Sequence, residues 1–253
     1  MTSPQITLYR GLPGHGTYTW SPFVNKLEAR MRLANVAYNA TEGSVLQSPR
    51  GKIPYLTVED KGTSRMISDS TLIIQELVGD GLLPDLNAKL HPKDKTLDLA
   101  LRALLEDRYY FLQGHEKWVH NYYTVRDHLF ASFSYPLRVI IGNMVYRKQT
   151  QMLYNQGTLR FSDEEIKVFK QEIWKDINDL LVSSRAKVDG DSPFWALGGE
   201  DPTEVDATLY GFIVGSRVCP AAPESQSIIN GFPVVVEYAK RIHDRFFPDY
   251  AWV

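Results

Sequence analysis

One stretch of this 253-residue sequence decides the expected fold: KIPYLTVED, residues 52–60. Ile53 to Val58 is predicted to be a strand, and Pro54 lies inside it. Because a proline cannot donate a hydrogen bond to a neighbouring strand, this position is either at a sheet edge or in a turn that requires one isomer of the peptide bond before Pro54. If the Ile53–Pro54 bond is cis, the main chain of Ile53 turns outward. It then offers its N–H and C=O groups to an extended peptide.

The elements around this stretch predict a small α/β domain over residues 1–85. One helix is expected to begin at Ser21-Pro22, since serine is a good cap and proline suits the first helical position. A second helix begins at Asp69-Ser70. Further strands are expected at Ile6–Tyr9, Val36–Ala40 and Arg65–Ile67. The order is β-α-β, then a hairpin, then α, which implies a parallel first pair and an antiparallel last pair.

The rest of the chain, residues 95–253, is predicted to be an all-helical domain that follows a linker at residues 82–95. Apolar residues at helical spacing mark one helix from Leu97 to Arg108 and another from about Val125 to Asn155. Two capping boxes open further helices, and Phe232-Pro233 opens the last one. The boxes are Ser162 with Glu165 and Thr203 with Asp206.

Composition predicts an ordinary protein of the cytoplasm. Lys and Arg number 28 and Asp and Glu number 30, so charge gives no reason to expect nucleic acid or an anionic membrane as partner. No apolar run approaches the roughly 18 residues that span a bilayer, and the first residues lack the pattern of a signal peptide. The single cysteine, Cys219, excludes an intramolecular disulfide and a cysteine-based zinc site, and we interpret it as structural.

Motifs for metal, phosphate and serine-hydrolase chemistry fail on their spacing. His115 and His120 resemble the histidine pair of zinc proteases, but histidines five apart on an α-helix point about 140° away from each other. We therefore expect two partly exposed histidines here and no metal. The loop from Gly11 to Gly16 lacks the glycine spacing of a dinucleotide loop and the ending of a phosphate loop. No Gly-x-Ser-x-Gly elbow occurs.

Three short segments share one physical property, which is that each can hold part of a small extended zwitterion. The Ser21 hydroxyl lies at a helix N-terminus, where unpaired N–H groups and the helix dipole favour negative charge. The main chain of Ile53 can pair with a peptide. Asp69-Ser70 opens another helix, which can hold a carboxylate on its N–H groups and an ammonium on Asp69. Together they predict a site for a zwitterion with an anionic group near Ser21.

In this order the segments resemble the cytosolic glutathione transferases. That fold joins a thioredoxin-like N-terminal domain of the β-α-β-α-β-β-α type to an all-helical C-terminal domain. Four stretches are similar to the metaxin and failed-axon-connections branch: SPFVNKLE at 21–28, SPRGKIPY at 48–55, DSTLII at 69–74 and LGGEDPTEVDAT at 197–208. Thr203 and Asp206 match the buried capping box of the superfamily. The resemblance implies a glutathione-dependent detoxification enzyme that forms a homodimer.

The resemblance also implies which residues bind glutathione. Ile53, before the presumed cis-Pro54, pairs with the cysteinyl part. Asp69 and Ser70 hold the γ-glutamyl end. The glycyl carboxylate is assigned to Lys52, with Lys26 or Arg50 as alternatives.

The position next to the glutathione sulfur falls to Ser21. Other glutathione transferases place a catalytic tyrosine at the end of the first strand, where this chain has Tyr9, and the intact Ser-Pro helix start favours Ser21. A free thiol titrates near pH 8.5, so little of it is thiolate at neutrality. A hydrogen bond from Ser21 and the helix N-terminus would lower that pKa by about one to two units, or roughly 1.4–2.7 kcal/mol.

The electrophile is expected between the two domains, beside an aromatic and basic cluster of a kind that is more often core or domain interface than substrate pocket. Its members are Tyr109, Tyr110, Trp118, Tyr122, Tyr123 and Arg126. The loop over residues 13–20 is long enough to cover or reshape this pocket. A competing hypothesis is a non-catalytic, metaxin-type module that binds protein partners. The complete set of Ser21, Lys52, Pro54, Asp69 and Ser70 favours an enzyme.

Overall fold

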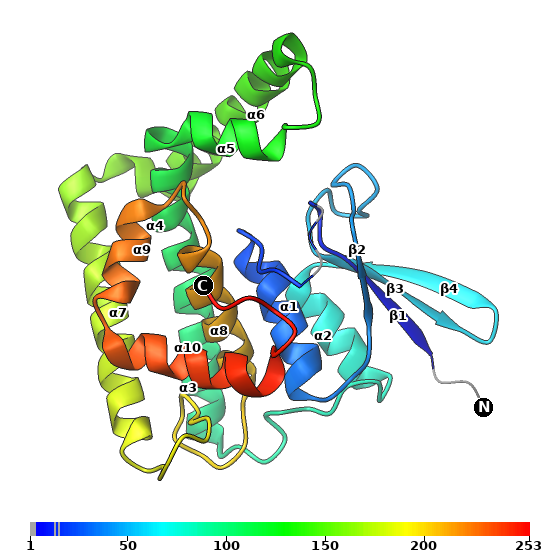
Figure 1. The fold of residues 1–253 in the computed structure, drawn as a ribbon, viewed down its shortest axis with the longest axis vertical. Helices are drawn as coiled ribbons and strands as arrows, with labels where there is room; N and C mark the ends of the chain where they lie inside the picture. The colour runs from blue at the N-terminus through cyan, green and yellow to red at the C-terminus, as the bar shows by residue number, and fades with distance from the viewer. Residues whose placement is uncertain (1–3, 13, 15) are drawn as a thin grey trace.

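The computed structural model describes residues 4–12, 14 and 16–253, so Pro13 and His15 of the expected covering loop lie outside the described residues. Figure 1 shows one sheet beside a large helical region. The strand order is β2-β1-β3-β4. The parallel β1–β2 pair and the antiparallel β3–β4 pair confirm the prediction, and β1 and β3 are also antiparallel. The strands are β1 (Gln5–Tyr9), β2 (Asn39–Thr41), β3 (Tyr55–Asp60) and β4 (Thr63–Ser68).

Two helices pack on one face of this sheet, α1 (Pro22–Leu33) and α2 (Ser70–Gly79). Alternate residues of β1, Ile6 and Leu8, point to that face and join a buried cluster with Leu27 of α1 and Ile73 of α2. The predicted helix starts are confirmed, since the side chains of Ser21 and Asp69 cap the two helices. The N-terminal part is therefore thioredoxin-like.

The segment between β2 and β3, residues 42–54, contains turns and no helix. The full β-α-β-α-β-β-α order places a helix there, so this part of the expectation is wrong for the chain. Pro49 and Gly51, whose φ is +61°, interrupt the segment and explain why it does not continue as a helix. The sheet face that carries Met66 is accordingly less covered, and Met66 is 44% exposed.

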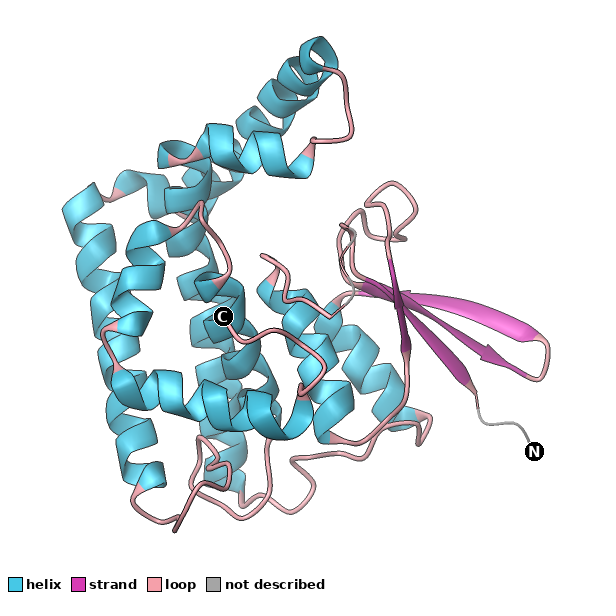
Figure 2. Cartoon of the chain, viewed as in Figure 1, coloured by secondary structure: helices cyan, strands magenta, loops and turns pink. Residues whose placement is uncertain are grey.

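The remainder is helical (Figure 2). The stretch predicted as one helix at 125–155 is two helices, α5 and α6, separated by a turn at residues 130–134. Two short segments, η1 and η2, are π-helical and η3 is a 3₁₀-helix. The elements are α3 (Pro92–Ala103), η1 (Leu104–Tyr109), α4 (Tyr110–His115), η2 (Glu116–His120), α5 (Tyr122–Leu129), α6 (Tyr135–Gln156), η3 (Thr158–Arg160), α7 (Asp163–Arg185), α8 (Glu204–Arg217), α9 (Pro223–Asn230) and α10 (Pro233–Phe246).

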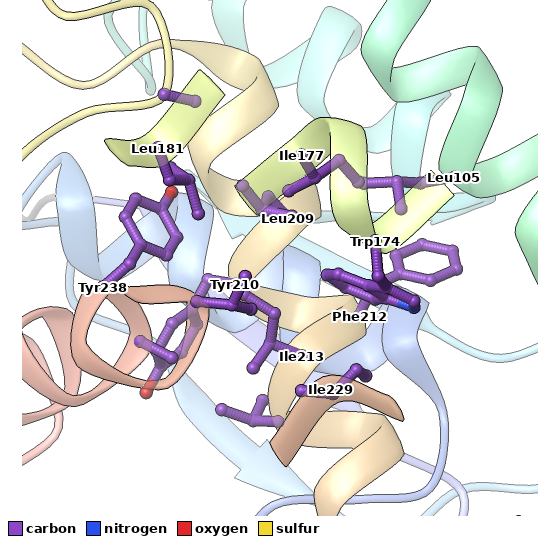
Figure 3. Packing of buried hydrophobic residues seen from close by; sticks show 14 of the residues in the cluster. Leu105, Trp174, Ile177, Leu181, Leu209, Tyr210, Phe212, Ile213, Ile229 and Tyr238 are labelled. Atoms are coloured by element: carbon purple, nitrogen blue, oxygen red, sulfur yellow. The ribbon is translucent and has the colours of Figure 1, made fainter. Parts of the chain in front are cut away.

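Helix α8 forms the centre of the helical region, and Figure 3 shows its Leu209 and Phe212 packed against Trp174 and Ile177 of α7. The two predicted capping boxes are confirmed. Asp206 is fully buried at the start of α8. Its carboxylate accepts hydrogen bonds from the Thr203 and Ala196 N–H groups, both at 2.7 Å. None of the described helices has the length and apolar character that crossing a bilayer requires.

Candidate functional site

Two of the three candidate segments, the turn at Ile53–Pro54 and the start of α2, adjoin neighbouring strands of the sheet. β3 begins at Tyr55, directly after Pro54, and Tyr55 pairs in register with Ser68 at the end of β4. Asp69 follows Ser68 and caps α2. The turn at Ile53–Pro54 and the start of α2 therefore lie at the same end of the sheet, as strand pairing requires.

The third segment, the start of α1, lies close to the start of α2. Lys26 Nζ, just over one turn into α1, donates a hydrogen bond to Thr71 Oγ1 at 3.1 Å, and Thr71 is in the first turn of α2. The structure thus brings together the three segments that the sequence singled out.

Ser21 is half-buried, and its hydroxyl donates a hydrogen bond to no acceptor among the residues that the structure describes. Its Oγ accepts a hydrogen bond from the Val24 N–H at 3.4 Å, which uses the oxygen lone pair and not the O–H group. Asn25 holds the segment before α1 in place by hydrogen bonds to the main chain of Thr19. Its Oδ1 accepts from the Thr19 N–H at 3.0 Å and its Nδ2 donates to the Thr19 C=O at 2.9 Å. Sequence reasoning missed Asn25, which is 1% exposed.

Two glycines of α8 let that helix rest on the backbone of the first turn of α1. A Cβ atom on Gly211 would lie 2.5 Å from Lys26 N and 2.6 Å from Pro22 O. A Cβ on Gly215 would lie 3.1 Å from Asn25 Nδ2. The Gly-x-x-x-Gly spacing was the available sequence signal, because it places both residues on one helix face. The position of Ser21 is therefore set by the helical region as well as by the sheet.

The Ile53–Pro54 peptide is cis, which confirms the expectation. The Ile53 side chain packs on Gly11, where an added Cβ would lie 2.6 Å from Ile53 Cδ1 and where φ is +93°. Within residues 4–12, 14 and 16–253, neither the N–H nor the C=O of Ile53 makes a hydrogen bond. These two groups are what an added extended peptide would need.

Asp69 adopts φ +81°, a conformation that is rare outside glycine but tolerated by Asp. Its Oδ1 accepts from the Thr71 and Leu72 N–H groups at 3.1 and 3.3 Å. Neither of these two bonds uses Oδ2. Ser70, at the first position of α2, is 5% exposed.

The basic candidates divide by exposure. Lys52 and Arg50 are exposed beside the Ile53 turn. Lys26 is 1% exposed and forms an ion pair with Glu106, with 2.6 Å between Nζ and Oε1. The alternative in which Lys26 binds the ligand carboxylate is therefore wrong.

Tyr9 lies on the sheet face that points away from α1. Strand alternation puts Ile6 and Leu8 against α1 and turns Tyr9 to the other side. There its ring stacks on Tyr55, with 4.5 Å between ring centroids and 8° between planes. This geometry favours Ser21 as the residue beside a ligand sulfur.

The predicted aromatic cluster does not form one pocket. Tyr109 is fully buried in the helical core, with its ring edge-on to Trp174 at 5.2 Å, which corrects its assignment to a substrate pocket. Tyr110 also packs against the core, and its ring centroid lies 5.0 Å from that of Phe23. Tyr110 belongs to the packing between α1 and the helical region, and Tyr109 belongs to the core of the helical region.

The remaining members lie in two other places. Tyr122 contacts Tyr146 and donates a hydrogen bond to Asn143 Oδ1 at 3.0 Å, which places it in the α5–α6 contact. Arg126, 8% exposed, binds the neighbouring Asp127 in that contact, and Tyr123 is 70% exposed. Trp118 alone among the predicted members shares a cluster with Trp20, the residue before Ser21.

Trp20 therefore belongs to a group of packed residues near Ser21, and sequence reasoning missed this group. Its indole stacks on His128 with centroids 3.5 Å apart. Lys117 Nζ donates to the Trp20 C=O at 3.5 Å, and burial lowers the pKa of Lys117. Cys219 is fully buried in the same cluster, and burial raises the pKa of its thiol. A buried, protonated thiol agrees with a structural role.

Two cavities lie elsewhere on the molecule. One of about 400 Å³ is lined by Arg32, Tyr38 and Asp249, among others. The other, of about 290 Å³, is lined by His115, His120 and Asp163, among others. Neither is lined by Ser21, Ile53 or Asp69.

Comparison with known proteins identifies the architecture. Residues 22–124 match the model of the glutathione S-transferase N-terminal domain. Glutathione transferase GSTFuA3 from Phanerochaete chrysosporium superposes with a TM-score of 0.59 at 16% identity, covering 98% of each chain. This chain has the glutathione transferase fold.

Two further structures share this glutathione transferase fold. FzlA from C. crescentus gives a TM-score of 0.60 at 13% identity, over 98% of this chain and 93% of that one. Maleylacetoacetate isomerase from Anaeromyxobacter dehalogenans, solved with bound dicarboxyethyl glutathione and citrate, gives 0.53 at 12% identity over 99% and 92%. The matched N-terminal domain includes Ile53 and Asp69 and begins one residue after Ser21.

Proposed function

We propose that this protein is a glutathione transferase-like enzyme that binds glutathione and activates its thiol for attack on a small hydrophobic electrophile. The observation that carries the proposal is the convergence of three polar groups at one end of the sheet. They are the Ser21 hydroxyl, the Ile53 main chain, to which no described residue hydrogen-bonds, and the Asp69 carboxylate. The match to the glutathione S-transferase N-terminal domain and the bound glutathione derivative in one fold relative support it.

Glutathione would lie extended across this end of the sheet. Its cysteinyl amide groups would pair with the Ile53 N–H and C=O, as in an added strand. Asp69 would bind the γ-glutamyl ammonium, and the N–H groups near Ser70 at the start of α2 would bind the neighbouring carboxylate. Lys52 is exposed beside the turn, where it could reach the glycyl carboxylate. The cysteinyl sulfur would then face the start of α1.

Ser21 would act as a hydrogen-bond donor and not as a nucleophile. Its O–H and the N-terminus of α1 stabilise the thiolate more than the thiol, which lowers the thiol pKa. The thiolate then forms a C–S bond with an electrophilic carbon, and the displaced group leaves with the bonding electron pair. The same thiolate could instead add to a double bond for isomerisation or elimination. No metal takes part in this scheme.

The electrophile is proposed to bind beside Trp20, which directly precedes Ser21, and Trp118 of η2, which packs against the same buried cluster. A homodimer that acts in cytoplasmic detoxification would be consistent with this chemistry. The metaxin and failed-axon-connections branch is the subgroup we propose. A non-catalytic, metaxin-type binding module is the second candidate, and titration with glutathione distinguishes the two.

Calorimetric titration with glutathione tests the proposal. We expect a dissociation constant between micromolar and millimolar. Asp69→Asn keeps the helix cap and tolerance of positive φ but removes the charge, so it should weaken binding by about tenfold or more. Asp60→Asn, at the opposite end of β3, is the matched control and should bind like wild type. Absence of binding by the wild-type protein would favour the non-catalytic module.

A further inference from the structure

His115 and His120 meet although they are five residues apart. The segment between them, η2, is π-helical, and its hydrogen bonds join residues five apart, as in the Asn121 N–H to Glu116 C=O bond of 3.1 Å. Residues at that spacing therefore share a face, and the two ring centroids are 4.9 Å apart. The expectation that the imidazoles point apart holds for an α-helix and is wrong here.

Asp163, the first residue of α7, lies against both rings. Its Oδ1 is 3.0 Å from His120 Nε2 and 3.6 Å from His115 Nε2. One ligand atom from each of the three side chains lies within 4.8 Å of the other two. Tetrahedral zinc with bonds of about 2.0–2.1 Å separates its ligand atoms by about 3.3 Å, a value between those two distances.

We propose that His115, His120 and Asp163 bind a divalent transition-metal ion, for which Zn²⁺ is the best match. Two imidazoles and one carboxylate form a donor set that favours Zn²⁺ over Ca²⁺ and Mg²⁺. The three side chains line the cavity of about 290 Å³, so water can complete the coordination. Nothing in this site takes part in the glutathione chemistry proposed above.

The charges around the site favour a cation. Glu116 and Glu224 line the same cavity, and Lys170 lies between them, with its Nζ 2.9 and 2.6 Å from their carboxylates. Together with Asp163, three carboxylates and one ammonium line this cavity. The positive N-terminus of α7 opposes the metal, and the carboxylates of its first turn offset that effect.

A bound ion would connect η2 to the start of α7. η2 also carries Lys117, which donates a hydrogen bond to the Trp20 C=O, and Trp118, which packs against the same buried cluster as Trp20. The metal is therefore a structural tie between the surface of the helical region and the segment near the candidate site. Its presence should raise the thermal stability of the protein.

Titration of the metal-free, untagged full chain with Zn²⁺ at pH 7.5 tests the site by calorimetry. We expect one ion per chain and a dissociation constant in the micromolar range. His120→Gln and Asp163→Asn each remove one ligand, and each should weaken binding by at least about tenfold. Both side chains are partly exposed, at 45% and 62%, so the variants should fold. Circular dichroism checks this.

Two controls match these changes. Glu164→Gln removes the same charge from the same helical turn, and His91→Gln replaces an exposed histidine elsewhere. Both should bind Zn²⁺ like wild type. Co²⁺ provides an optical readout, because ligation at this site should give a visible absorption that Asp163→Asn and His120→Gln lose. Failure to bind Zn²⁺ below about 1 mM, or binding and Co²⁺ spectra that neither ligand variant changes, would overturn the proposal.

Discussion

Lys26 Nζ lies 2.6 Å from Glu106 Oε1, and this ion pair joins the helix capped by Ser21 to the helical region. The Thr208 hydroxyl of α8 donates to the same Glu106 oxygen at 3.1 Å. Lys26 also contacts Thr71 of α2. The first turns of α1 are thus held by three other elements at once, which fixes where the candidate site lies.

Lys26→Met should lower the free energy of unfolding by roughly 3 kcal/mol, because it leaves the Glu106 charge without its partner. The double variant Lys26→Met/Glu106→Leu should recover most of that loss, since no unpaired charge remains. Urea unfolding of the two single variants and the double variant measures the coupling. A double variant as unstable as the sum of the single ones would show that the pair does not act as a unit.

Ser21→Ala should reduce turnover of a model electrophile by about ten- to a hundredfold at neutral pH, since the thiol pKa would rise by about one to two units. Glutathione affinity should change little. Tyr9→Phe should leave turnover unchanged, because Tyr9 lies on the other face of the sheet. Kinetics across pH measures the thiol pKa in each variant.

The control for the loss of a helix cap is Ser162→Ala, which removes the capping serine of α7. It should cost about 1 kcal/mol of stability and leave turnover at the wild-type level. Loss of turnover in Tyr9→Phe with full turnover in Ser21→Ala would reverse the assignment.

Gly211→Ala should destabilise the protein by roughly 1–3 kcal/mol, because its new methyl group would press on the backbone of Lys26 and Pro22. An alanine normally favours a helix over glycine, so the sign of this change is diagnostic. Gly79→Ala, at the end of α2 with nothing within 4 Å, is the matched control and should be neutral or slightly stabilising. Thermal unfolding distinguishes them, and equal stability of the two variants would contradict the close approach.

Asp249→Asn should destabilise the fold at neutral pH and not in strong acid. The Arg32 guanidinium donates to Asp249 Oδ2 at 2.8 Å and holds the pKa of that carboxyl below its usual value near 3.8. The folded state thus binds this proton less tightly than the unfolded chain. The pair stabilises the fold above the usual pKa, and this contribution disappears as the pH falls through the lowered pKa. Chemical unfolding against pH should show the two proteins converging in acid; a constant difference would contradict it.

The elements that local sequence signals specify were predictable. A capping side chain and its hydrogen-bond partner lie within one helical turn, so the starts at Ser21, Asp69, Ser162 and Thr203 could be found without tertiary information. The same holds for the turn at Pro54. Of these features, the helix starts at Ser21 and Asp69 and the turn at Pro54 belong to the candidate site.

The features that sequence reasoning missed depend on distant contacts. Lys26 resembles a surface lysine, but Glu106 is 80 positions later in the chain and buries it. Tyr109 lies in an aromatic-rich stretch, and only the packing of Trp174 against it shows that it is core. The prediction that the His115 and His120 imidazoles point apart depends on α-helical geometry. No local sequence signal marks a π-helical turn.

That π-helical turn also makes chain length a structural variable. η2 holds one residue more than an α-helical path would need between the same two ends. Removing one residue between His115 and His120 would restore α-helical winding between the same two ends, and the two histidines would then lie four apart on one face of an α-helix. The facing of the two imidazoles therefore depends on how many residues separate them, given the winding of the turn, and a substitution inside the turn leaves that number unchanged.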